Sequence, residues 1–112
     1  MKYADKISMA DLMDEQGEYC GRLVQIFSIL GNKIRFKILC LLHDGEKCVT
    51  ELVEAIENAK EPNVSQQLKL MTSAGILSKR RDGRMRYYSL ADNDVAEFIS
   101  FLKQYHASRK QG

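Results

Sequence analysis

The sequence has little of what secreted and membrane proteins contain. Its 112 residues include one proline and three cysteines, and no apolar run reaches the roughly 20 residues that a membrane span needs. An odd number of irregularly spaced cysteines argues against a secreted disulfide framework. Asp5, Asp11 and Asp14 interrupt the N-terminal segment, so we do not expect a signal peptide there. These absences favour a cytoplasmic protein with no membrane contact.

The chain has enough apolar material for one small domain. With 45% hydrophobic and 29% charged residues, it can bury a single modest core, and chains of this size often complete their core by dimerising. We expect a loosely ordered segment over 1–16, one domain over 17–107 and a polar tail over 108–112.

Charge is distributed unevenly along the chain. Residues 60–86 hold seven Lys and Arg against two acidic residues, whereas residues 1–21 hold two Lys against five acidic residues. A locally basic stretch on a nearly neutral chain favours a surface that faces a polyanion, although many basic faces are only solvated.

Apolar residues recur at helical spacing over most of the chain. One helix is expected from Glu18 to Gly31, and a second from Asn32 to about His43. A third helix begins near Cys48, since Glu51 stands at the capping-box position three residues later. The only proline, Pro62, is suited to the first turn of a fourth helix that ends at Gly75.

The period changes after Gly75. Residues 76–81 and 84–90 alternate as strands on either side of Asp82-Gly83, which predicts a β-hairpin with that pair as its turn. Alternation would then place Arg84 and Arg86 on one face. A last helix follows, capped by Asp92 or Asp94. Helices 48–57 and 62–74, joined by a tight turn and followed by a basic hairpin, predict a mostly α (α+β) winged helix-turn-helix fold.

Four stretches of this sequence resemble the ArsR/SmtB family of small winged-helix repressors, over residues 23–106. They are "ILGNKIRFKILCLL" (29–42), "EKCVTEL" (46–52), "VSQQLKLMTSAGIL" (64–77) and "KRRDGRMRYYSL" (79–90). The resemblance implies a homodimer that binds a two-fold symmetric DNA operator as a repressor. It also implies release from the operator by a metal, a metalloid or a redox signal.

Two groups of polar residues are candidates for contact with double-stranded DNA. The fourth helix would read bases in the major groove, and the arginines of the hairpin would hold phosphates or enter a narrow minor groove. Glu61, at the start of that helix, would repel phosphate. The candidates are Asn63, Ser65, Gln66, Gln67, Lys69, Arg80, Arg81, Arg84 and Arg86.

The first and last long helices are expected to pair across a two-fold axis, because their apolar stripes are too wide for one small domain to bury. The alternative is that these stripes are plain core faces. The residues expected in the dimer interface are Tyr19, Leu23, Ile26, Phe27, Phe98, Ile99 and Leu102.

The sensing site is open between two interpretations. The family's Cys-Val-Cys motif stands here as Cys48-Val49-Thr50, so one thiol is kept. Cys48 with Cys20 could bind a soft metal or metalloid ion or form a redox pair. Alternatively, Cys48 only replaces a capping serine. The zinc motif of the last helix lacks its imidazoles, so Asp92 is interpreted as a helix cap.

Other function classes are less favoured. The sequence has no metal-hydrolase, phosphate-loop or nucleophile-elbow motif, so we do not expect an enzyme. Two alternatives stay open: a winged-helix module that binds an acidic protein or RNA without an operator, and a repressor of this family that has lost ligand sensing.

Overall fold

The computed structural model describes residues 8–111, which form two units, one up to Asn32 and one from Lys33 onward. The first unit holds α1 (Met9–Met13) and α2 (Tyr19–Leu30). Ser8 and Asp11 cap α1 reciprocally, with Ser8 Oγ accepting from the Asp11 backbone N–H at 3.2 Å. Residues 1–7 of the predicted N-terminal segment lie outside the described residues.

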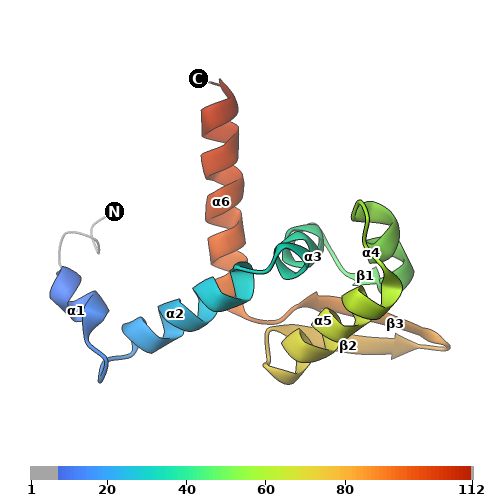
Figure 1. Ribbon diagram of the computed structural model, residues 1–112, viewed down its shortest axis with the longest axis horizontal. Coiled ribbons are helices and arrows are strands. Elements are labelled where there is room, and N and C mark those ends of the chain that lie inside the picture. Colours follow the sequence, from blue (N-terminus) through green and yellow to red (C-terminus); the bar gives the residue numbers. More distant parts are fainter. Residues whose placement is uncertain (1–7, 112) are drawn as a thin grey trace. The chain divides into compact units, whose positions relative to one another are not determined.

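The second unit contains the predicted winged helix-turn-helix, which confirms the fold class (Figure 1). Its helices are α3 (Lys33–His43), α4 (Val49–Ala55), α5 (Glu61–Ser73) and α6 (Asn93–Gln111). Strands β1 (Lys47–Cys48), β2 (Leu77–Asp82) and β3 (Met85–Leu90) form one antiparallel sheet in the order β1-β3-β2. No helix among residues 8–111 is long and apolar enough to cross a membrane.

The core of this second unit is built around α5. Val64, Leu68 and Met71 follow each other at helical spacing and are fully buried, and α5 contacts α3, α4 and β2. The other fully buried side chains come from the surrounding elements: Ile38, Leu39, Leu52, Ile76 and Val95. One stripe of α5 is therefore committed to the core, and its opposite face is left to solvent.

The chain leaves α5 through a Schellman motif. The Gly75 N–H donates to the Thr72 carbonyl at 3.1 Å, and the Ile76 N–H donates to the Met71 carbonyl at 2.9 Å. Gly75 has a φ of +79°, a left-handed conformation that glycine adopts without steric cost. The predicted end of the helix is confirmed, and the motif turns the chain directly into β2.

The hairpin turn lies one residue later than predicted. Asp82 pairs with Met85 in the ladder, so the two loop residues are Gly83 and Arg84, rather than Asp82 and Gly83. Gly83 has a φ of +64°, as the first loop position of a type II′ turn requires. Arg84 thus lies in the loop, and the prediction that strand alternation groups it with Arg86 was wrong.

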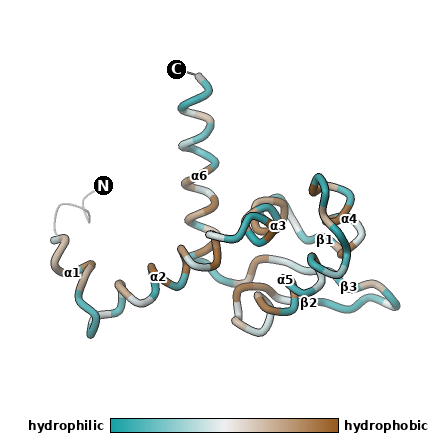
Figure 2. The backbone as a smooth tube through the Cα atoms, viewed as in Figure 1, coloured by the Kyte–Doolittle hydropathy of each residue, from teal (hydrophilic) through white to brown (hydrophobic). Residues whose placement is uncertain are grey.

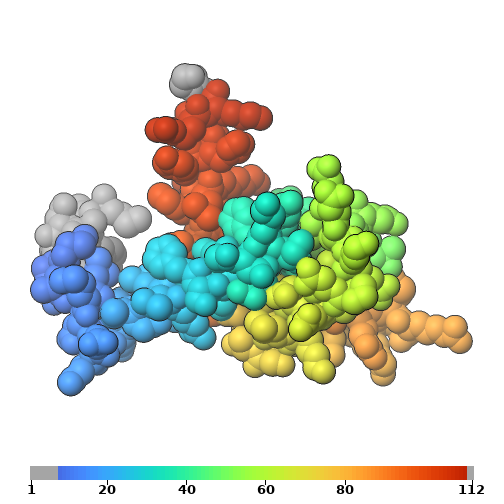
Figure 3. Space-filling model, in the orientation of Figure 1, coloured from blue at the N-terminus to red at the C-terminus, as the bar shows by residue number. Residues whose placement is uncertain are grey.

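Strand β1 was absent from the sequence prediction. It has only two residues, and it pairs with β3 through Lys47 opposite Tyr88 and Cys48 opposite Tyr87. This pairing ties the start of α4 to the hairpin. Figure 3 shows the hairpin in orange as a projection from the body of the second unit, and Figure 2 shows β2 as hydrophilic toward the turn.

Candidate DNA-binding surface

A cleft of about 580 Å³ lies between α5 and the hairpin. Ser65, Lys69 and Thr72 face it from α5, at the spacing of one helix face. Lys79 and Arg86 face it from β2 and β3, and Glu61 is its single acidic lining residue. Three cations against one carboxylate make the cleft a positively charged groove between a helix and a wing.

The register of the hairpin adds to this charge. Lys79 pairs with Tyr88, and Arg81 pairs with Arg86; paired residues of a ladder point to the same face of the sheet. Lys79, Arg86 and Tyr88 line the cleft, so Arg81 belongs to the face directed toward α5. Like charges directly opposite each other destabilise a sheet, and an anion bound over this pair would relieve their repulsion.

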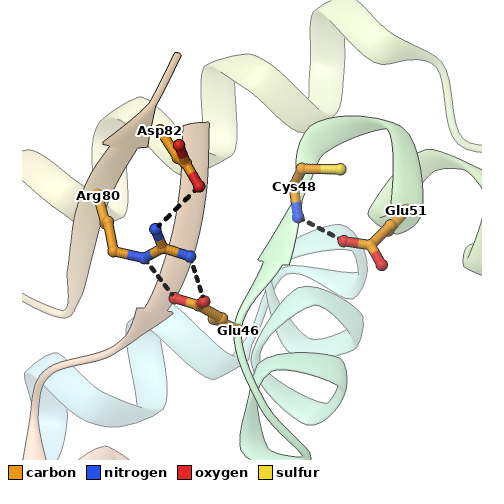
Figure 4. A network of polar contacts seen from close by, with 5 residues as sticks. All are labelled: Glu46, Cys48, Glu51, Arg80 and Asp82. Atoms are coloured by element: carbon orange, nitrogen blue, oxygen red, sulfur yellow. Dashed lines mark hydrogen bonds and ion pairs between the residues drawn. The ribbon is translucent and has the colours of Figure 1, made fainter. Parts of the chain in front are cut away.

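Arg80 belongs to the opposite face of the hairpin, where the protein itself supplies its partners (Figure 4). Its guanidinium donates to both carboxylate oxygens of Glu46, at 2.6 and 3.2 Å. It also lies 4.7 Å from the centre of the Tyr87 ring and 3.8 Å from the Asp82 carboxylate. Bidentate pairing of this kind is among the stronger charge-assisted contacts. The Glu46 brace, as we call these contacts of Arg80, holds both strands of the hairpin to the loop before β1.

Hydrogen bonding within the Glu46 brace changes the ionisation of its members. The bond from Arg80 lowers the pKa of the Glu46 carboxyl, and the bond to Glu46 raises the pKa of Arg80. Both groups are therefore held in their charged forms. All four hairpin arginines among the DNA-binding candidates are exposed, and the charge of Arg80 is balanced by Glu46.

The five polar candidates of α5 differ in accessibility. Asn63, Gln66 and Lys69 are exposed, and Ser65 and Gln67 are half-buried. Gln67 accepts a hydrogen bond from Arg35 of α3 at 3.0 Å and donates one to Asn63 at 3.3 Å. Both ends of the Gln67 amide are thus used within the protein.

Cys48 occupies the junction between the hairpin and α4. It is the N-cap of α4, in the predicted capping box with Glu51, whose carboxylate accepts from the Cys48 backbone N–H at 2.9 Å. That hydrogen bond lowers the pKa of Glu51. The Cys48 residue is only 6% exposed and lies beside a small hollow of about 200 Å³ that Arg84, Met85 and Arg86 also line.

The remaining sensing candidates are placed as follows. Cys20 lies in α2, in the first unit, and Cys20, Cys40 and Cys48 are all free thiols. Burial raises the pKa of the Cys40 thiol. Asp92 accepts from the Val95 N–H at 3.1 Å, so its predicted role as a helix cap is confirmed. Over residues 8–111, no three His, Cys, Asp or Glu side chains come together as metal ligands.

The residues expected in a dimer interface separate into two sets. Ile26 and Ile99 are buried, and Leu23, Phe98 and Leu102 are half-buried, whereas Tyr19 and Phe27 are 48% and 60% exposed. Three further apolar residues are also widely exposed: Val24 on α2, and Phe101 and Tyr105 on α6. Residues 103–110 of α6 are exposed on every side, and Figure 1 shows this part of α6 extending beyond the other elements of its unit.

Several residues of this surface were missed in the sequence. Lys79, Thr72 and Tyr88 line the cleft, Glu46 holds Arg80 and Arg35 holds Gln67. Correct strand register would have revealed Lys79 and Tyr88. The partners of Glu46 and Arg35 lie more than 30 residues away in sequence, where local patterns carry no signal.

Comparison with known proteins agrees with this geometry. Residues 32–79 match the family described as "Bacterial regulatory protein, arsR family". The chain is 34% identical over 80 residues to the uncharacterized HTH-type transcriptional regulator Rv0081 of Mycobacterium tuberculosis, covering 71% of this chain and 70% of that protein. It belongs to the ArsR family. The predicted resemblance is confirmed, and the chain is a DNA-binding transcriptional regulator, not an enzyme.

Two further relatives extend the comparison. The HTH-type transcriptional repressor SmtB of M. tuberculosis is 33% identical over 89 residues, which cover 80% of this chain and 60% of that protein. The crystal structure of the AntR antimony-specific transcriptional repressor superposes with a TM-score of 0.75 at 25% identity, over 95% of this chain and 99% of AntR. The ArsR winged-helix fold therefore extends over nearly all of the chain.

The Glu46 brace predicts a specific titration. Because the Arg80 hydrogen bond lowers the pKa of Glu46, the brace contributes stability above the ordinary carboxyl pKa and loses it as pH falls through the lowered value. The substitution Arg80→Met is expected to return the Glu46 pKa toward its ordinary value, and an NMR titration of the carboxyl groups measures this change. Glu51 is the internal control, since its pKa is lowered by Cys48. An unchanged Glu46 titration in Arg80→Met would contradict the brace.

Proposed function

We propose that this ArsR-family chain is a homodimeric repressor that binds a two-fold symmetric operator and is released by a signal acting on the Cys48 thiol. The observation that carries the DNA-binding geometry is the cationic cleft between α5 and the hairpin. A helix fits the major groove and a basic wing follows the backbone beside it, so the cleft is the natural seat for the phosphates between them.

The roles in DNA binding follow from exposure and charge. Asn63, Ser65 and Gln66 lie toward the N-terminal half of α5, the part of a recognition helix that approaches base edges. Lys69, Lys79 and Arg86 line the cleft and hold phosphates. Arg81 and Arg84 extend the same basic surface over the wing. These contacts give affinity and register, and sequence is read from α5.

Glu61 limits how the phosphates can lie. It is in the first turn of α5 and lines the same cleft as Lys69 and Arg86. A carboxylate repels phosphate but can accept a hydrogen bond from the cytosine amino group. The sugar-phosphate backbone of the DNA is therefore expected to pass over the Lys69 end of the cleft. The Glu61 end would then face the bases.

Salt dependence tests the wing. Arg86→Ala is expected to weaken binding to all duplexes and to reduce the slope of log K against log salt by about 2 in a symmetric dimer, since each phosphate contact contributes about 0.9. Arg84→Ala should have the same effect. Lys110→Ala also removes one positive charge, near the end of α6, and is the control. Fluorescence anisotropy at several salt concentrations measures the slope; equal slopes for Arg86→Ala and Lys110→Ala would count against the proposed docking.

Exposed apolar residues on α2 and α6 support a dimer. Tyr19, Val24, Phe27, Phe101 and Tyr105 are each at least 48% exposed, and an isolated helix as exposed as the end of α6 gains little stability without packing. A second copy would bury these side chains. Symmetric pairing would also place two recognition helices about one DNA turn apart.

Introducing a charge at an exposed residue of the proposed interface tests the dimer. Phe27→Glu is expected to give a monomer by sedimentation velocity, because two carboxylates would replace apolar contacts across the two-fold axis. Gln25→Glu, also exposed on α2, adds the same charge as a control and should leave the dimer intact. Dimers of unchanged stability in Phe27→Glu would exclude α2 from the interface.

A thiol-directed signal is supported by the position of Cys48. The residue caps α4 and pairs with Tyr87 of the wing, so a change at its sulfur would reach the wing directly and α5 through α4, which packs against it. Because the described residues gather no complete ligand set, we assign no metal geometry. A soft ion and an oxidant would both act on a thiol, so the proposed signal is a reagent of either kind that acts on Cys48. Cys20 is the candidate for a second thiol.

Parallel inducer arms distinguish the sources of the signal. Operator binding is measured with As(III), Cd(II), Zn(II), peroxide and reductant. Cys48→Ser puts a capping hydroxyl in place of the thiol and does not coordinate soft ions, so it should bind the operator normally and lose the response. Cys20→Ser should lose the response as well if two thiols are needed. Unchanged operator affinity in every arm would favour a repressor of this family without ligand sensing.

The interaction-module alternative has a separate outcome. A winged helix that binds an acidic protein or RNA would show no preference for one duplex sequence over another. A preference that survives at high salt, where phosphate contacts are screened, favours the operator.

A further inference from the structure

Three polar side chains form a hydrogen-bonded chain that leads from α3 to the exposed face of α5. The Arg35 Nη1 donates to the Gln67 Oε1 at 3.0 Å, and the Gln67 Nε2 donates to the Asn63 Oδ1 at 3.3 Å. Arg35 and Gln67 are half-buried, and Asn63 is exposed in the first turn of α5. The chain therefore runs from the protein interior to the surface that faces DNA.

The direction of this chain follows from the chemistry of its first member. A guanidinium has only donors and stays protonated, so Gln67 must present its carbonyl oxygen to Arg35. The Gln67 amide nitrogen then faces Asn63, which must present its own oxygen. Gln67 makes its hydrogen bond to the Asn63 oxygen and not to the Asn63 Nδ2, which is a group that can only donate.

We propose that Arg35 is a positioning residue that acts through Gln67 to make Asn63 a hydrogen-bond donor toward the operator. The inference rests on the proposed docking of α5 in the major groove. An asparagine with both amide atoms available pairs with adenine N6 and N7. With its oxygen held by Gln67, Asn63 instead matches an edge made of acceptors, as guanine presents through O6 and N7.

This inference revises the role expected of Gln67. A glutamine that contacts a base must turn its amide toward the groove, but here both ends of the amide are engaged by Arg35 and Asn63. Gln67 sets the orientation of Asn63 and does not itself read DNA. A half-buried cation thereby contributes to specificity without touching the nucleic acid.

The test compares base preferences by selection from random duplexes, followed by anisotropy with the selected site. Wild type is expected to prefer guanine at one symmetric pair of positions, and Asn63→Ala should remove that preference alone. Arg35→Met should weaken it by about fivefold per half-site, the usual worth of one hydrogen bond, with an unchanged salt slope. Arg35→Lys keeps a donor for Gln67 and should retain the preference. Combining Arg35→Met with Asn63→Ala should add nothing.

Gln67→Met interrupts the hydrogen bonds between Arg35 and Asn63 without altering Arg35. It replaces Arg35→Met in the test if Arg35→Met does not fold. A guanine preference that is as strong in Arg35→Met or Gln67→Met as in wild type would overturn the inference, and so would an adenine preference lost in Asn63→Ala. An equal loss on all duplexes with a shallower salt slope would show Arg35 on phosphate instead. If wild type shows no salt-dependent duplex binding, the proposed function fails first, and the inference fails with it.

Discussion

Burial of one stripe of α5 is the constraint on which the rest of the surface depends. Val64, Leu68 and Met71 are fully buried, and a shift of one residue along a helix rotates every side chain by about 100°. The core therefore determines which residues α5 presents to the cleft and which to its neighbours. Lys69 reaches the cleft and Gln67 reaches Arg35 only because Leu68 between them points inward.

A second set of contacts fixes the wing against this helix. The two-residue strand β1 joins the hairpin through its pairing with β3, and the Glu46 brace holds Arg80 on the far face of the hairpin. The near face, toward α5, holds Lys79, Arg81 and Arg86, which are exposed and take no part in the Glu46 brace. One arginine thus joins the wing to the loop before β1, while the basic residues on the other face are those that we propose hold phosphates. Alternation along β2 and β3 separates the two roles.

Much of the fold was predictable because its signals are local. The apolar period of α3, α5 and α6, the proline in the first turn of α5 and the glycine after it all predicted the observed elements. The hairpin was predicted with its turn one residue early, since Asp82-Gly83 and Gly83-Arg84 both place glycine where a tight turn tolerates it. The cleft could be predicted only in part. Lys69 and Arg86 followed from type and position, but Glu46 and Arg35 act on residues more than 30 positions away, which no local pattern reveals.

The capping of α4 by a thiol has a consequence for kinetics. Sulfur is a weaker hydrogen-bond acceptor than a hydroxyl oxygen, so the first turn of α4 is held less firmly than a serine cap would hold it. Cys48 is also almost completely buried, so fraying of that turn would increase the access of a reagent to its sulfur. Local openings of this kind require far less free energy than global unfolding. Fraying of this one helical turn is therefore expected to speed the reaction of a thiol reagent with Cys48, which is both the target and the cap of the turn.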